Sequence, residues 1–210
     1  AMNGELKQLT RRVLTISYKH KLSHLGSCLT ALPIIWEIYE KKGSDEKFFL
    51  SNSHAALALY VVLEYYGFGS AEELFEKHGV HANYDPKHDI WASGGSLGHV
   101  CSIALGSALA NRDKDVWLLT SDGEMMEGSC WEALRLKSEL GVSNLKWSIN
   151  CNGFGAFKVI ETDKLREMVR VFCEDVVIKN TDVNDYPFLE GLVGHYYVLK
   201  GDEKNRAGQK

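Results

Sequence analysis

The feature that most constrains the fold is a pair of short, mainly apolar segments separated by a helical one. Residues 116–120 ("VWLLT") and 145–149 ("LKWSI") have the length and composition of buried strands. Between them, Ser129 and Glu132 match a capping box, and Gly141 ends the helix that they open. A strand, a crossover helix and a second strand place two parallel strands in one sheet. This unit predicts an α/β fold with a mainly parallel sheet.

The rest of the chain alternates in the same way. Helices are predicted over residues 5–20, 30–42, 54–66, 70–79, 101–110 and 162–173, and one more strand over 176–178. Pro33 falls in the first turn of its helix, where a proline costs no hydrogen bond. No repeat, linker or low-complexity tract divides the sequence. We therefore expect a single domain over residues 1–200 and a polar tail over 201–210.

Composition excludes several classes of protein. The 210 residues are 45% hydrophobic and 25% charged, with a formal net charge of −4, which gives no electrostatic case for binding nucleic acid or anionic lipid. No apolar stretch approaches the roughly 20 residues that span a bilayer, and the first residues lack the apolar core of a signal peptide. The five cysteines form no C-x-x-C pair and are expected to be inert buried thiols. We expect a soluble cytoplasmic protein.

Polar side chains follow both strands of the central unit. Asp122 lies in "SDGEMMEG" after the first strand, and Asn152 lies in "NCNGFG" after the second. Neighbouring parallel strands end at one edge about 4.8 Å apart, so both side chains can reach one ion. A carboxylate, an amide oxygen and a nearby backbone carbonyl suit Mg²⁺ or Ca²⁺, and so incomplete a shell favours Mg²⁺ carrying phosphate groups. The alternative is that Asp122 and Glu124 only favour the start of a helix.

Taken in order, the motifs resemble those of the transketolase family, in particular its domain that binds the diphosphate of thiamine diphosphate. "SDGEMMEG" and "NCNGF" stand where that family has Gly-Asp-Gly and, about 30 residues later, Asn. "SHLGS" at 23–27 and "LSNSH" at 50–54 are similar to its "GHPGS" and "LSNGH". "GGSLGH" at 94–99 and "FLEGLVGHYY" at 188–197 resemble its "TGSLGQG" loop and its late glutamate-then-histidine segment. The resemblance implies a three-layer thiamine diphosphate-binding fold, with helices on both faces of the sheet.

The resemblance also implies which residues bind metal and cofactor. Mg²⁺, or Ca²⁺ in its place, would be held by the side chains of Asp122 and Asn152 and by the backbone carbonyl of Phe154. The remaining contacts to thiamine diphosphate would come from His54, Leu97, Gly98, Gly123 and again Asn152.

The catalytic set implied by the resemblance is His24, His81, His195 and Glu127. The histidines would line the substrate channel and move protons or bind hydroxyls, and His81 falls where the family has a "GHP" histidine. Glu127 would lie at a subunit interface that links two cofactor sites. Judged singly, His24 and His54 are as typical of helix caps or surface groups, and Glu127 of a solvated acid at a helix start.

The resemblance further implies a partner chain. The family's glutamate that activates the aminopyrimidine ring lies on a separate pyrimidine-binding domain, and the sequence after residue 200 has no room for it. We therefore expect another subunit to supply that domain and its Glu, in a heterotetramer with two copies of each chain.

Departures from the family pattern bear on the substrate. Ser121 replaces the usual first glycine, Val100 replaces a glycine where it is expected to crowd the loop, and the chain is short after Gly155. We expect a thiamine-diphosphate-dependent transferase that, with its partner, moves a two-carbon ketol unit between sugars or sugar phosphates, and the shortening favours a branched or unusual sugar over an ordinary pentose phosphate. The alternatives are a decarboxylating condensation like that of 1-deoxy-xylulose-phosphate synthase, and a non-catalytic scaffold or regulatory subunit.

Overall fold

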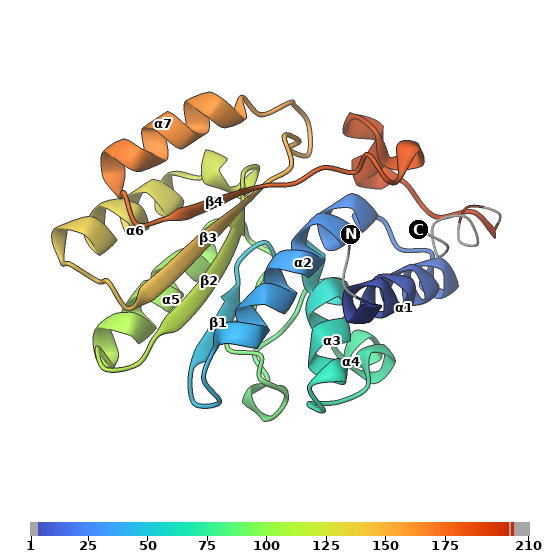
Figure 1. Ribbon diagram of the computed structural model, residues 1–210, viewed down its shortest axis with the longest axis horizontal. Coiled ribbons are helices and arrows are strands. Elements are labelled where there is room, and N and C mark those ends of the chain that lie inside the picture. Colours follow the sequence, from blue (N-terminus) through green and yellow to red (C-terminus); the bar gives the residue numbers. More distant parts are fainter. Residues whose placement is uncertain (1–3, 202, 204–210) are drawn as a thin grey trace.

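A parallel sheet forms the centre of the computed structural model, which describes residues 4–201 and 203 (Figure 1). In sheet order its strands are β1 (Lys47–Leu50), β2 (Val116–Ser121), β3 (Leu145–Cys151) and β4 (Val177–Asn180). Ser121 of β2 lies level with Asn150 of β3, so the two strands end at one edge, as predicted. The expected polar tail falls mainly on residues 202 and 204–210, which lie outside the described residues.

Helices cover both faces of the sheet (Figure 1). On one side are α1 (Gly4–His20), α2 (Leu25–Lys41), α3 (Ala56–Tyr65) and α4 (Ala71–His78). On the other are α5 (His99–Ala110), α6 (Gly128–Glu139) and α7 (Thr162–Phe172). Successive side chains of β1 point to opposite faces of the sheet, so the strand contributes to the hydrophobic core on each face. Phe48 and Leu50 pack with α1–α3, and Phe49 packs with α5–α7. The predicted three-layer α/β fold is confirmed.

The predicted start of α2 was wrong. The helix begins at Leu25 rather than at residue 30, which places Pro33 inside it. An interior proline removes one backbone hydrogen bond. Most residues of the helix are buried, including Leu29 and Ile34 near the proline. This burial offsets the cost of the missing hydrogen bond. The earlier start matters for the site, because it brings the residue before the helix, His24, to the edge of the sheet.

The two predicted capping boxes had different outcomes. Ser70 caps α4 and accepts a hydrogen bond from the Glu73 N–H, as expected. Ser129 does not cap α6, since that helix already begins at Gly128. The Ser129 hydroxyl instead donates to the Gly98 carbonyl at 3.1 Å, so it ties α6 to the loop before α5.

Strand β1 is absent from the sequence predictions, and β4 runs over Val177–Asn180 rather than over 176–178. Val100 lies in the first turn of α5 and is fully buried in the core that α5–α7 form with the sheet. Within residues 4–201, no helix combines the length and the apolar character needed to cross a membrane.

Candidate functional site

A cleft of about 330 Å³ opens at the carboxyl edge of the sheet. Its walls come from the turns after β1, β2 and β3 and from the segments before α2 and α5. Nine of the predicted site residues line it: His24, His54, His81, Leu97, Gly123, Glu127, Asn152, Phe154 and His195. The other two lie directly behind these, Asp122 buried beneath Gly123 and Gly98 buried beside Leu97. Folding therefore gathers the whole predicted set in one place.

Asp122 and Asn152 are joined through the backbone of the turn after β3. The two carboxylate oxygens of Asp122 accept hydrogen bonds from the N–H groups of Gly123 (2.8 Å) and Gly153 (2.7 Å). The side-chain oxygen of Asn152 accepts one from the Phe154 N–H at 3.0 Å. Burial nevertheless raises the pKa of Asp122 to about 6, since the carboxylate is almost fully enclosed. A cation at this position would restore the charged form of Asp122.

Gly123 lies where two loops approach each other closely. A Cβ at this position would lie 3.3 Å from the Cα of Gly155 and 3.8 Å from the Phe154 carbonyl oxygen. The loop after β3 is itself folded back, with the Gly155 N–H donating to the Lys158 carbonyl at 2.8 Å. Backbone groups of both loops therefore reach the cleft without intervening side chains, which suits an anionic ligand.

Three histidines form a cluster on the α2 side of the cleft. The ring centroids of His24 and His195 are 4.4 Å apart, those of His24 and His54 are 5.5 Å apart, and the His24 N–H donates to the His195 carbonyl at 3.0 Å. Burial, with smaller contributions from neighbouring histidines, lowers the pKa of His24 to about 4 and that of His54 to about 3. Burial also lowers the pKa of His195. At neutral pH these rings are uncharged, and each can donate one hydrogen bond and accept another.

The capping role considered for His24 does not describe the structure, whereas Glu127 is an exposed acid at the start of a helix, as the alternative for it stated. His24 precedes α2 in a left-handed conformation (φ 61°), and no side-chain capping bond joins it to that helix. Glu127 precedes α6, likewise without a side-chain cap bond, and is exposed at the mouth of the cleft. His81 lies opposite, with Nδ1 3.3 Å from the Ser53 hydroxyl.

Glu124 is a site residue that sequence reasoning missed, because it was interpreted only as an acid at a helix start. It is fully buried. Its Oε1 accepts hydrogen bonds from the Ser51 hydroxyl (2.5 Å) and from the Gly98 N–H (2.8 Å), and burial raises its pKa to about 7. Glu124 thus fixes the loop before α5 against the ends of β1 and β2.

Unpaired polar atoms concentrate in this cleft. Among the described residues, the buried side-chain atoms without a hydrogen-bond partner are Ser17 Oγ, His24 Nδ1, Asn52 Nδ2, Asn52 Oδ1 and Glu124 Oε2. All except the serine hydroxyl belong to residues that line the cleft. Because burying an unpaired polar atom costs about 1–3 kcal/mol, such a concentration indicates a ligand site. The oxygen donors beside it fit Mg²⁺ and a phosphate-bearing cofactor.

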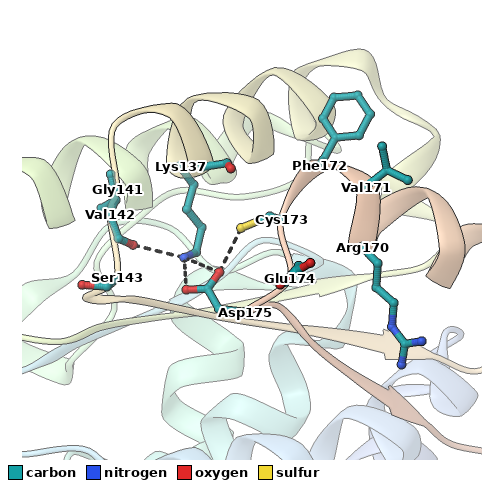
Figure 2. Close-up of a pocket in the computed structure, with 11 residues that line it drawn as sticks. Lys137, Gly141, Val142, Ser143, Arg170, Val171, Phe172, Cys173, Glu174 and Asp175 are labelled. Atoms are coloured by element: carbon teal, nitrogen blue, oxygen red, sulfur yellow. Dashed lines mark hydrogen bonds and ion pairs between the residues drawn. The ribbon is translucent and has the colours of Figure 1, made fainter.

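A larger cavity, about 480 Å³, lies at the opposite edge, where β3 and β4 begin (Figure 2). Its buried cation, Lys137, contacts both carboxylate oxygens of Asp175 at 2.8 and 2.6 Å and the Val142 carbonyl at 3.1 Å. Asp175 also accepts a hydrogen bond from the Cys173 thiol. These bonds join the end of α6 to the segments entering β3 and β4, so the arrangement is structural.

Comparison with known proteins gives consistent relatives, although no protein-family model matches the chain. It is 30% identical over 195 residues to a subunit of apulose-4-phosphate transketolase from Phocaeicola vulgatus, covering 82% of this chain and 69% of that protein. It is 33% identical over 152 residues to human transketolase, covering 63% of this chain but 24% of that enzyme. A third relative, a putative transketolase family protein of Sinorhizobium fredii, is 36% identical over 126 residues, 54% of this chain and 44% of that one.

The fold agrees with these relatives. The crystal structure of transketolase from Campylobacter jejuni matches with a TM-score of 0.75 at 19% sequence identity, over 99% of this chain and 43% of that one. This chain thus corresponds to part of the larger enzymes. The similarity in sequence, the shared fold and the gathering of the family's motifs in one cleft lead to one conclusion: the chain belongs to the transketolase family.

Proposed function

We propose that this chain anchors thiamine diphosphate through Mg²⁺ in the cleft, as one subunit of a transketolase-type transferase. One observation carries the proposal: Asp122 and Asn152 converge from the ends of adjacent parallel strands on a cleft that holds most of the chain's unpaired buried polar atoms among the described residues. The donor set is all oxygen, as Mg²⁺ requires.

In this proposal each residue has a defined task. The side chains of Asp122 and Asn152 and the carbonyl of Phe154 hold the metal, while the Gly123 N–H and His54 contact the diphosphate. When bound, thiamine diphosphate supplies the carbanion-stabilising centre for making and breaking a carbon–carbon bond next to a carbonyl.

The remaining residues would orient the cofactor and the substrate. Leu97 and Gly98 would lie against the aminopyrimidine ring, where the loop is held by Glu124. His24, His81 and His195 would bind substrate hydroxyls and move protons. The lowered pKa values of His24 and His195 support the binding of hydroxyls, since a neutral imidazole donates a hydrogen bond from one nitrogen and accepts one at the other.

The substrate would be a sugar or sugar phosphate from which a two-carbon ketol unit is transferred. The name of the Phocaeicola relative, which specifies apulose 4-phosphate, supports this class. That relative is also named as one subunit of its enzyme, which supports a separate partner chain that brings the pyrimidine-binding domain and its activating glutamate. Two copies of each chain, with Glu127 at their interface, would form the assembly.

The metal role is tested by Asp122→Asn in the assembly purified with its partner. Titration calorimetry should show thiamine diphosphate affinity in the presence of Mg²⁺ falling at least about 10-fold, because one anionic ligand to the cation is lost. Asp163→Asn is the control, as that carboxylate is 93% exposed on α7. Equal affinity in the wild type and in Asp122→Asn would rule out the proposed metal site.

A further inference from the structure

Asn52 occupies the floor of the cleft at the carboxyl end of β1. The preceding residue, Ser51, still pairs with β2 through a hydrogen bond from its N–H to the Leu119 carbonyl at 2.9 Å. The Asn52 side chain is fully buried and yet lines the cleft. It therefore belongs to the lining of the cleft at the edge of the sheet.

The neighbours of Asn52 use their polar groups within the protein. The Ser51 hydroxyl donates to Glu124, the Ser53 hydroxyl is 3.3 Å from His81 Nδ1, and the Asn52 carbonyl accepts from the Ala55 N–H at 3.0 Å. The Asn52 carboxamide is the exception, since neither Nδ2 nor Oδ1 has a partner among the described residues.

Other buried amides of this chain show what a structural asparagine looks like. Asn144 Nδ2 donates to the carbonyls of Ala108, Asn111 and Lys114 at 3.0, 3.0 and 2.9 Å. Asn150 donates to Thr30 and accepts from the hydroxyl of Thr181. A buried amide with both atoms unpaired is costly to keep, and a binding role accounts for its presence.

We infer that Asn52 is a further ligand-binding residue, a step that rests on the proposed function, and that its carboxamide takes a neutral group able both to accept and to donate. A phosphate oxygen only accepts, so it would pair Nδ2 and leave Oδ1 unpaired. A hydroxyl of the sugar substrate satisfies both atoms, and so does the amino-substituted pyrimidine ring of the cofactor. The sugar hydroxyl and the pyrimidine ring share this chemistry, and separate titrations of substrate and cofactor distinguish them.

The first test uses the chain without ligand. Asn52→Leu keeps the number and branching of the side-chain heavy atoms and breaks no hydrogen bond within the described protein, so the thermal midpoint should stay the same or rise by about 1–5 °C. Asn144→Leu is the matched control and should lower the midpoint by more than about 5 °C, because it removes three hydrogen bonds. A fall in Asn52→Leu as large as that in Asn144→Leu would show that Asn52 is structural and overturn the inference.

The second test measures binding to the assembly with its partner. Thiamine diphosphate is titrated with Mg²⁺ present, and apulose 4-phosphate, the sugar phosphate in the name of the Phocaeicola relative, is then titrated into the cofactor-loaded assembly. Asn52→Leu is expected to lower the affinity about 10-fold in one of the two titrations. A loss in the thiamine diphosphate titration assigns Asn52 to the pyrimidine ring, and a loss in the sugar phosphate titration assigns it to a sugar hydroxyl.

Asp122→Asn in the same titrations separates the inference from the proposed function. If Asp122→Asn weakens cofactor binding while Asn52→Leu changes neither titration, the inference alone is overturned. If Asp122→Asn leaves cofactor binding intact, the proposed function fails and the inference fails with it.

Discussion

His24 and His54 are held in the cleft as neutral rings, and this has a consequence for stability. Their pKa values in the folded chain, about 4 and about 3, lie below the value of about 6.5 expected in the unfolded chain. The unfolded state therefore binds protons more readily. The stabilising contribution of each ring is fully present above pH 6.5 and is lost as the pH falls from 6.5 toward 4.

Acidification should consequently weaken the unliganded chain through these rings. Between pH 7.5 and 5, urea unfolding should show a loss of free energy of unfolding about 2 kcal/mol greater in the wild type than in His54→Asn. The pKa values of Asp122 and Glu124 are raised, so acidification stabilises the folded chain through these two groups. Both proteins carry them, so their contribution cancels in the comparison. His99→Asn, at an exposed histidine outside the cleft, is the control. Identical pH profiles for wild type and His54→Asn would contradict this account.

At the scale of elements, the start of α5 depends on a glycine in a special conformation. Gly98 has a φ of 77°, and a Cβ there would lie 2.3 Å from Ser129 Oγ and 2.8 Å from Glu127 Cβ. Gly98→Ala should lower the free energy of unfolding by about 1–3 kcal/mol. Gly106→Ala, in the same helix with open space around it, should raise it by about 0.5–1 kcal/mol. Chemical denaturation measures both, and a loss of similar size in the two variants would contradict the steric explanation.

The elements also show where local patterns fail. β1 has only the apolar residues 48–50 after a charged segment, too short a run for periodicity to identify. Its pairing with β2, residue by residue from Lys47 to Leu50, makes it a strand. The start of α2 was misplaced because Pro33 resembles a first-turn proline. Burial against α1, α3 and the sheet stabilises the helix beyond what the local sequence indicates.

At the scale of the whole molecule, apolar side chains surround the mouth of the cleft. Leu97, Met126 and Phe157 are 37%, 40% and 73% exposed, and they come from three different loops that line the cleft. Exposed apolar side chains that gather in one place, rather than singly, mark an interaction surface. These three residues support the proposed contact with a second chain that would close the site.

A charge at this mouth should therefore prevent assembly without unfolding the chain. Met126→Lys is expected to reduce co-purification of the partner at least about 10-fold, as measured by native mass spectrometry of the tagged chain. Val171→Lys is the control, since Val171 is 85% exposed on α7 and lines the cavity at the other edge. Undiminished partner recovery with Met126→Lys would place the interface elsewhere.

The sequence by itself determined the α/β class, the order of most elements and the presence of two oxygen-bearing side chains at the strand ends. These follow from local signals: apolar runs, caps, and a spacing of one strand-helix-strand unit between Asp122 and Asn152. Tertiary structure alone decided which polar groups lack partners. Glu124 and Asn52 stand inside the motifs "SDGEMMEG" and "LSNSH", but burial and hydrogen bonding are properties of the packed chain. They distinguish Asn52, with neither amide atom paired among the described residues, from Asn144, which is bonded to three carbonyls.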